Sequence, residues 1–175
     1  MLRSVPPHPP KTVDHVDLPR YLGKWFEIAV IPYFWETGCE YTTAEYSMNK
    51  DNKSVRVSNK CIRYGKESEN VGKATPEDDS FSKFKLQFIQ TLDIAGGYWI
   101  VRLGSNYEYS VVSSPDYKYL WVLSRTPTMD NSVYDSIIES LKKDEFPVEK
   151  LRKTKQEWSR TKILLFKIFK FWTEK

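Results

Sequence analysis

The sequence is poor in the residue types that most catalytic and metal sites use. Its 175 residues include two cysteines and two histidines, and both histidines lie in or beside a proline-rich N-terminal stretch. Cys39 and Cys61 are too few for a disulfide scaffold and lack the spacing of a metal site. There is also no phosphate-binding loop, nucleophile elbow or paired acid motif. We therefore expect no enzyme activity, no metal and no cofactor.

Long apolar runs are missing as well. Residues 1–10 contain neither the apolar segment of a signal peptide nor a cysteine that follows one. We expect that the chain stays in the cytosol or that a leader has been removed from it. The prolines of this stretch predict an extended, solvated arm over residues 1–15.

Aromatic residues are abundant, at 15% of the chain, whereas alanine is scarce, and this balance favours strands over helices. The length suits one domain with extensions. The net charge of +4 is uneven, because residues 142–175 hold 11 Lys/Arg and 5 Asp/Glu. A basic tail on a slightly acidic body argues against a nucleic-acid-binding core.

Short segments that alternate polar and apolar residues recur along the chain with turn signals between them. We expect eight strands, over residues 22–31, 41–48, 54–62, 70–75, 81–89, 98–103, 107–113 and 119–125. Consecutive antiparallel strands with short loops most economically close into an up-and-down barrel. A two-sheet sandwich is the alternative, but it needs a long connection that the sequence lacks.

The polar turn at residues 49–53 predicts a hairpin in which Tyr46 faces Val55. In that register Glu40 faces Cys61, and a one-residue bulge would bring Cys39 opposite Cys61 for a disulfide. In a reducing compartment the two would remain thiols.

After residue 128 the apolar spacing becomes helical, with Asp130 as the N-cap and Lys142 and Lys143 at the C-terminal end. We expect one amphipathic helix packed on the outside of the barrel. Its apolar stripe contains Val133, Ile137, Ile138 and Leu141.

Gly23, Lys24 and Trp25 enter the first predicted strand, and Arg125 leaves the last. A guanidinium stacked on a tryptophan ring can still donate hydrogen bonds in its own plane. Such a pair would seal one end of a closed sheet.

These motifs occur in a fixed order: residues 16–18 and 21–29, then 43–47 and 57–61, then 96–98 and 115–128. In that order they resemble the lipocalin family, and within it the bacterial Blc-like outer-membrane lipoproteins, apolipoprotein D and the plant temperature-induced lipocalins. The resemblance runs from about Val13 to Gln156 and implies a barrel that is open at one end and holds a hydrophobic ligand. Two departures are Phe26, where tyrosine is usual, and the lack of a lipidated N-terminal cysteine.

The resemblance assigns structural roles at the closed end to five residues: Gly23, Trp25, Asp116, Tyr117 and Arg125, of which Asp116 and Tyr117 would fill the second conserved turn of the family. It also implies a lipid ligand, most simply a fatty acid or lysophospholipid. Glu27 and Arg102 are polar residues within predicted strands, which favours polar anchors or solvated positions over an acid and a base, and inside the barrel either could orient a head group. The inward-facing candidates can also be ordinary core packing. The residues expected to contact the ligand are Phe34, Trp35, Ala44, Tyr46, Val55, Val57, Asn59, Phe84, Leu86, Phe88, Tyr98, Trp121 and Leu123.

Phe34 and Trp35 lie in a connection that is more aromatic than a solvated loop requires. They would form a lid on the ligand, the surface of a homodimer or a self-packed loop.

Residues 158–175 form a basic tail beyond the 16–157 lipocalin domain. A helix here would be amphipathic and too short to cross a bilayer, so we expect it to lie on an anionic membrane surface and to place the protein at the membrane periphery or cell envelope. Docking on the barrel or on a second copy is the alternative. The apolar face contains Leu164, Leu165, Ile168, Phe169, Phe171 and Trp172.

The predicted function is binding and storage or transport of a small hydrophobic molecule. Two rivals remain. One is an interaction scaffold whose barrel is filled by its own side chains, and the other is a lipid-modifying enzyme that uses a cysteine thiol.

Overall fold

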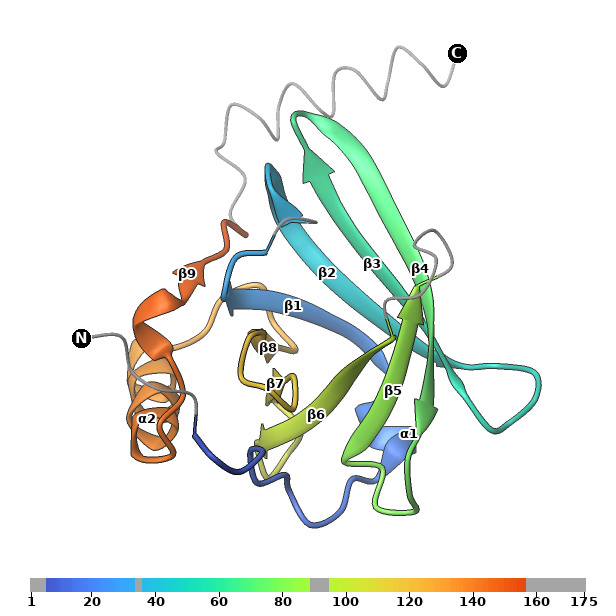
Figure 1. The fold of residues 1–175 in the computed structure, drawn as a ribbon. Helices are drawn as coiled ribbons and strands as arrows, with labels where there is room; N and C mark the ends of the chain where they lie inside the picture. The colour runs from blue at the N-terminus through green and yellow to red at the C-terminus, as the bar shows by residue number, and fades with distance from the viewer. Residues whose placement is uncertain (1–5, 34–35, 89–94, 157–175) are drawn as a thin grey trace, which may run out of the picture.

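A computed structural model of the chain describes residues 6–33, 36–88 and 95–156 (Figure 1). The barrel strands are β1 (Gly23–Val30), β2 (Cys39–Met48), β3 (Val55–Arg63), β4 (Lys66–Pro76), β5 (Lys83–Phe88), β6 (Ala95–Leu103), β7 (Tyr109–Ser113) and β8 (Leu120–Ser124). The remaining elements are helix α1 (Leu18–Tyr21), helix α2 (Asn131–Lys143), the 3-10 helix η2 (Val148–Lys150) and strand β9 (Arg152–Lys153).

The eight long strands form one closed antiparallel sheet. Each strand from β2 to β7 pairs with the next, β8 pairs with β1, and β1 pairs with β2. This closure leaves no free edge in the barrel. The predicted up-and-down barrel with a helix outside it is therefore confirmed, and the sandwich alternative is wrong.

The β2–β3 hairpin has a different register from the one predicted. Tyr46 lies opposite Val57 rather than Val55. The turn is longer than expected because the Asp51 carboxylate accepts hydrogen bonds from the backbone amides of Lys53 and Ser54 and keeps both residues out of the strands. Since the error is two residues, every side chain keeps its predicted face.

At the open end, the C-terminal segment lies between β1 and β2. The Tyr41 amide donates to the Lys155 carbonyl at 2.8 Å. The Gln156 side-chain amide donates to the carbonyls of Glu27 and Thr42, at 2.8 and 2.7 Å. This segment includes β9, which the sequence analysis missed because a short charged strand carries no apolar alternation.

The opposite end of the barrel is closed by Trp25 and Arg125. The Arg125 guanidinium lies 3.7 Å from the centre of the Trp25 ring, and Trp25 is fully buried. Gly23 has φ +94, which favours glycine, and brings the chain close to this guanidinium. The guanidinium also donates hydrogen bonds to five backbone carbonyls, those of Arg20, Tyr21, Leu22, Lys24 and Tyr107.

Asp116 and Tyr117 were predicted to lie at this closed end, and that placement is wrong. They belong to the β7–β8 connection at the open end, where the Tyr117 ring packs 4.9 Å from the ring of Phe146. The turn at the closed end contains Tyr107 instead. Its hydroxyl accepts a hydrogen bond from the Asp17 amide at 2.7 Å, and its ring lies beneath Arg20.

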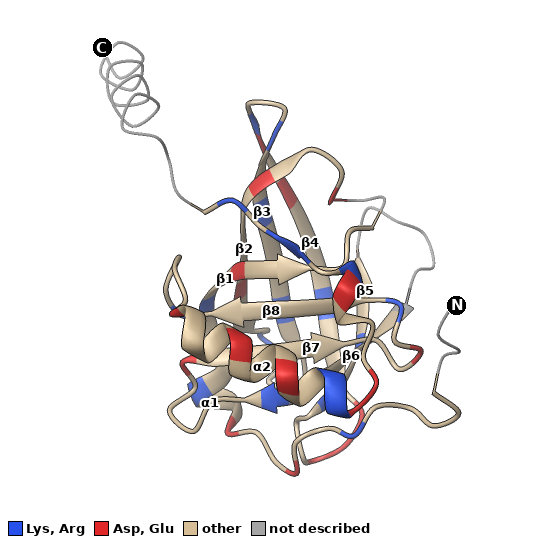
Figure 2. Ribbon diagram, turned by 90° about the vertical axis from the view of Figure 1, so that its left-hand side faces the viewer, with Lys and Arg blue, Asp and Glu red and all other residues tan. Residues whose placement is uncertain are grey.

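Helix α2 begins after the predicted N-cap, Asp130, and lies over the outside of the barrel, as Figure 2 shows. Its buried residues Ile137 and Leu141 pack in one apolar cluster with outward-facing side chains of β1, β6, β7 and β8. Arg102 joins the helix to the sheet, since its Nε donates to the Ser140 hydroxyl at 2.7 Å and its guanidinium forms an ion pair with Asp144. Arg102 is therefore an anchor for the helix and not a ligand for a head group.

The proline-rich arm is docked rather than solvated over part of its length. Pro10 is buried, and the Val13 amide donates to the Ile100 carbonyl at 3.0 Å. The tail at residues 158–175 lies outside the described residues. Within the described ranges, no helix has both the length and the apolar character that crossing a membrane requires.

Candidate functional site

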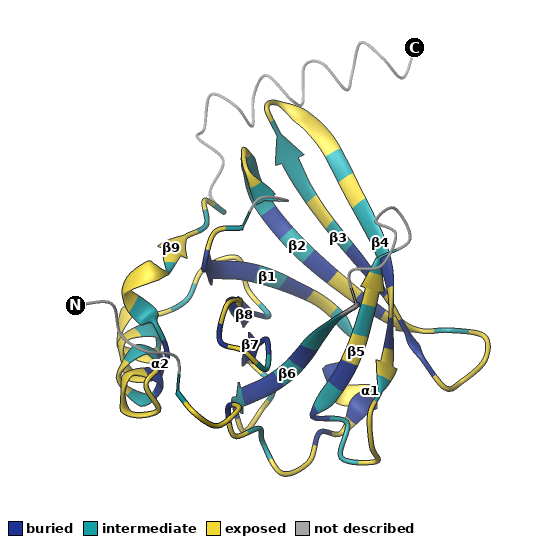
Figure 3. Ribbon diagram, in the orientation of Figure 1, coloured by how far each residue is buried: buried dark blue, intermediate teal, exposed yellow. Residues whose placement is uncertain are grey.

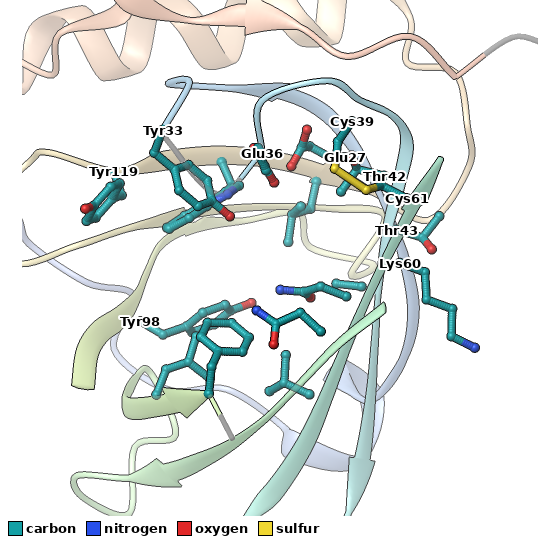
Figure 4. Close-up of a pocket in the computed structure, with 18 of the residues that line it drawn as sticks. Glu27, Tyr33, Glu36, Cys39, Thr42, Thr43, Lys60, Cys61, Tyr98 and Tyr119 are labelled. Atoms are coloured by element: carbon teal, nitrogen blue, oxygen red, sulfur yellow. A yellow bond between two sulfur atoms is a disulfide. The ribbon is translucent and has the colours of Figure 1, made fainter. Parts of the chain in front are cut away.

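The barrel interior contains a cavity of about 170 Å³ at its open end (Figure 4). Strands β1 to β6 and β8 contribute to its walls, together with the segments that follow β1 and precede β8. The inward-facing residues of β2 and β3 are buried toward the closed end and only half-buried toward Cys39 and Arg63 (Figure 3). The cavity therefore has an enclosed floor and a more accessible mouth.

Most of the residues predicted to contact a ligand line this cavity. They are Ala44, Tyr46, Val57, Asn59, Leu86, Phe88, Tyr98, Trp121 and Leu123. Val55 and Phe84 lie deeper and line a separate cavity of about 20 Å³. Phe34 and Trp35 lie outside the described residues. Contact with a ligand remains a prediction for all of them.

The floor of the cavity is a chain of buried hydroxyl groups. The Tyr98 hydroxyl lies 2.7 Å from that of Tyr21 and donates to that of Tyr46 at 3.0 Å, and Tyr21 also contacts the Ser110 hydroxyl at 2.9 Å. Burial raises the pKa of Tyr21 to about 12, so this hydroxyl stays neutral at physiological pH. The floor is thus polar but uncharged, and its hydroxyls are bonded to one another.

One side of the mouth is aromatic. The ring of Tyr33 packs edge-on against those of Tyr119 and Trp121, with centroids 5.4 and 5.8 Å away. Tyr119 and Trp121 stack on each other at 5.9 Å. These rings line the cavity beside the apolar side chains of β5 and β8, so together they form a continuous apolar surface.

The other side of the mouth carries two acidic residues, Glu27 and Glu36 (Figure 4). Glu27 is 3% exposed and accepts a hydrogen bond from the Thr154 hydroxyl. Burial raises its pKa, and burial together with the nearby charge of Glu27 raises the pKa of Glu36 to about 9. At neutral pH this pair therefore holds a proton.

Cys39 and Cys61 form a disulfide that lines the same mouth. The bond forms, but the predicted alignment is wrong, because Cys39 lies opposite Arg63 rather than Cys61 even after the register shift between Glu40 and Thr43. The Arg63 guanidinium donates to the Cys39 sulfur at 3.7 Å, and its charge partly lowers the raised pKa of Glu36. With both sulfurs bonded, this state offers no thiol nucleophile among the described residues.

Sequence reasoning missed much of the polar lining, including Tyr33, Glu36, Arg63, Ser68 and Asn70. Ser68 and Asn70 were missed as inward-facing residues because β4 begins at Lys66, before the predicted start, and its polar alternation carries no hydrophobic signal. Glu36 follows the strand and has no periodicity at all. Only the closure of the barrel brings these residues together.

Replacing Glu36 with glutamine is expected to stabilise the protein at alkaline pH. A carboxyl whose pKa is raised from 4.5 to about 9 contributes stability below pH 4.5 that is lost as the pH rises toward 9. As the pH rises through this window, the free energy of unfolding of the variant should fall by up to about 1.4 kcal/mol less per pH unit than that of wild type. Urea unfolding at several pH values measures the slope, with the exposed Glu67→Gln as the control. An unchanged slope in Glu36→Gln would contradict the burial of this carboxyl.

Replacing both cysteines with serine is expected to lower the free energy of unfolding by about 3 kcal/mol, because the bond closes a loop with a sequence separation of 22. Chemical denaturation of the variant and of wild type measures this difference. A loss below about 1 kcal/mol would contradict it. The same variant tests the thiol-enzyme rival, since a carrier keeps its ligand uptake without either thiol.

Comparisons with known proteins agree with this geometry. The lipocalin-like domain family matches residues 16–156. The outer membrane lipoprotein Blc of Citrobacter freundii is 35% identical over 156 residues, which cover 86% of each chain. Apolipoprotein D of Bos taurus is 33% identical over 86% of this chain and 82% of its own, and temperature-induced lipocalin-1 of Arabidopsis thaliana is 29% identical over 83% and 82%.

Solved structures share the fold at lower sequence identity. Insecticyanin from the tobacco hornworm, Manduca sexta, superposes with a TM-score of 0.69 at 21% identity, over 91% of this chain and 88% of its own. Lobster apocrustacyanin A1 gives 0.66 at 16% identity, over 89% and 94%. The family match spans the whole barrel, the outer helix and the segment that returns between β1 and β2. The chain therefore belongs to the lipocalin family.

Proposed function

We propose that this protein binds one single-chain lipid in the barrel cavity and stores or transports it, and that a fatty acid or a lysophospholipid is the simplest ligand. The observation that carries the proposal is one cavity with an apolar and aromatic wall beside a charged mouth. A molecule with one acyl chain and one polar head matches that division. Lipocalins in general bind or transport small hydrophobic molecules, which agrees with this assignment.

The shape of the cavity favours one slender chain over a bulky ligand. The cavity has a volume of about 170 Å³ and lies inside a narrow barrel. Buried side chains fill the barrel interior toward its closed end. Each methylene removed from water contributes about 0.8 kcal/mol, so the apolar wall supplies affinity and the polar mouth sets the orientation. The floor hydroxyls are already bonded to one another and would face the end of the chain.

Fluorescence titration tests the proposal, because Trp121 lines the cavity and would respond to an acyl chain beside it. We expect saturable quenching or enhancement at one lipid per chain with a fatty acid or a lysophospholipid. Replacing Trp121 with phenylalanine should remove most of the signal and keep the binding, which native mass spectrometry measures separately. The absence of any saturable response and of any bound lipid would exclude the carrier function.

We also propose that residues 158–175 hold the protein at a membrane surface. The described chain leads to the barrel mouth, where Lys155 and Gln156 are hydrogen-bonded between β1 and β2. A basic segment with an apolar face that starts there would bring the mouth near the lipid source. Blc is described as an outer membrane lipoprotein, which agrees with a site at the cell envelope.

A variant that ends at Glu157 tests this role by co-sedimentation with vesicles. We expect the full chain to bind vesicles with anionic lipid, to bind neutral vesicles less, and to lose binding when salt is raised. The shortened variant should stay in solution while it keeps its ligand uptake. Equal binding by both forms would refute the anchoring role.

A further inference from the structure

The cavity contains two buried hydrogen-bond acceptors that nothing in the described protein satisfies. They are Oε2 of Glu36 and Oδ1 of Asn70, and neither has a partner within residues 6–33, 36–88 and 95–156. Both residues line the cavity, Glu36 from the segment after β1 and Asn70 from β4. Figure 4 shows Glu36 at the mouth, close to the aromatic ring of Tyr33.

An acceptor that is buried without a partner costs about 1 to 3 kcal/mol, so two of them in one cavity require an explanation. The hydroxyl groups in the floor are engaged with one another. The Thr154 hydroxyl already donates to Glu27. The Glu36 carboxyl is also hydrogen-bonded to Tyr33 and Glu27, and these contacts leave its Oε2 without a partner. A hydrogen-bond donor on the bound molecule would satisfy the two acceptors that these hydroxyl groups leave without a partner, Oε2 of Glu36 and Oδ1 of Asn70.

The charges at the mouth indicate which donor suits the site. Glu27 and Glu36 are adjacent carboxyl groups, and Arg63 is the cation whose charge lowers the pKa of Glu36. Lys60 is directed away from the cavity in Figure 4, and its ammonium forms an ion pair with Glu69 at 3.9 Å. A ligand carboxylate would add a third acidic group beside one arginine, whereas a hydroxyl or ammonium group would meet acceptors.

We propose that the head group of the ligand donates hydrogen bonds to Glu36 and Asn70, so the preferred ligand is a single-chain lipid with hydroxyl or ammonium groups rather than a free fatty acid. This inference rests on the proposed function and narrows it. Monoacylglycerols, lysophospholipids with a free hydroxyl and long-chain amines all satisfy the requirement, and an ionised fatty acid does not.

The test compares three probes of equal chain length at neutral pH: a saturated fatty acid, the corresponding 1-monoacylglycerol and the corresponding primary amine. Displacement of a fluorescent fatty-acid analogue from the full chain gives the three affinities. We expect the monoacylglycerol and the amine to bind at least about tenfold more tightly than the fatty acid, which corresponds to the difference made by one satisfied acceptor.

Two variants locate the effect, with the exposed Glu67→Gln on β4 as the matched control. Glu36→Gln should weaken the amine about tenfold, because a bound ammonium group favours the ionised form of the Glu36 carboxyl and glutamine cannot ionise. It should weaken the monoacylglycerol less, because an amide oxygen still accepts from a hydroxyl. Asn70→Leu should weaken the monoacylglycerol and leave the fatty acid unchanged or tighter. A larger loss for the amine in Glu36→Gln identifies an ammonium contact, and equal losses identify hydrogen bonding alone.

A fatty acid that binds as tightly as the two donor probes would overturn this inference while leaving the carrier function intact. So would affinity ratios that neither Glu36→Gln nor Asn70→Leu changes. If no probe binds the wild-type chain, the proposed function fails, and the inference fails with it.

Discussion

Replacing Arg125 with alanine should lower the free energy of unfolding by about 3 to 5 kcal/mol, one of the largest losses available from a single residue outside the apolar core. The guanidinium covers the Trp25 ring at 3.7 Å and donates to five carbonyls of α1, β1 and the Tyr107 turn. Alanine would leave these carbonyls without their donor and would uncover the ring.

Arg152→Ala is the matched control. The Arg152 side chain is exposed, and among the residues that the structure describes it donates only to the nearby carbonyls of Glu149 and Leu151. Its loss should change the free energy of unfolding by less than about 0.5 kcal/mol. Chemical denaturation followed by tryptophan fluorescence measures both variants. If Arg125→Ala costs less than about 1 kcal/mol, the stacked pair does not seal the barrel.

Replacing Ala44 with phenylalanine should weaken lipid binding more than a hundredfold. Ala44 lies opposite Asn59 on the cavity wall, so a phenyl group would occupy the space in which we propose that the acyl chain binds. Displacing about four methylenes removes about 3 kcal/mol of apolar burial, which corresponds to more than a hundredfold in affinity. Circular dichroism and a thermal melt should show a folded barrel that is less stable by about 1 to 3 kcal/mol.

The control for this variant is Glu45→Phe, which adds the same ring to the exposed outer face of the same strand. It should keep wild-type affinity, because successive side chains of a strand point to opposite faces. Equal weakening by both substitutions would mean that the lipid does not occupy the barrel interior. Retained affinity in Ala44→Phe would lead to the same conclusion.

The fold was predictable from the sequence because its main signals are periodic. The alternation of Phe84, Leu86 and Phe88 and the helical spacing after Asp130 each follow from which face is buried. The predicted β2–β3 register was wrong by two residues, but this error leaves the prediction of inward-facing and outward-facing residues unchanged, because side chains alternate with a period of two. The Trp25 and Arg125 pair was predictable for a related reason, because both residues lie at strand ends that barrel closure brings together.

The chemistry of the mouth was not predictable in the same way. Glu36, Arg63 and Asn70 are polar residues whose proximity arises only when β1, β3 and β4 become parts of one closed wall. The wrong placement of Asp116 and Tyr117 has a different cause. An Asp-Tyr pair matches the short family motif wherever it occurs in the sequence. Only the direction of the flanking strands shows at which end of the barrel the pair lies. Homodimer formation through the loop after β1 remains a prediction.

We propose, above all, that one lipid occupies the barrel cavity. Native mass spectrometry of the full chain, gently purified and then incubated with a single-chain lipid, tests this most directly. The prediction is one bound lipid per wild-type chain, also in Glu45→Phe, with no retained lipid in Ala44→Phe. A wild-type chain that never carries lipid, or an Ala44→Phe chain with equal occupancy, would contradict the claim.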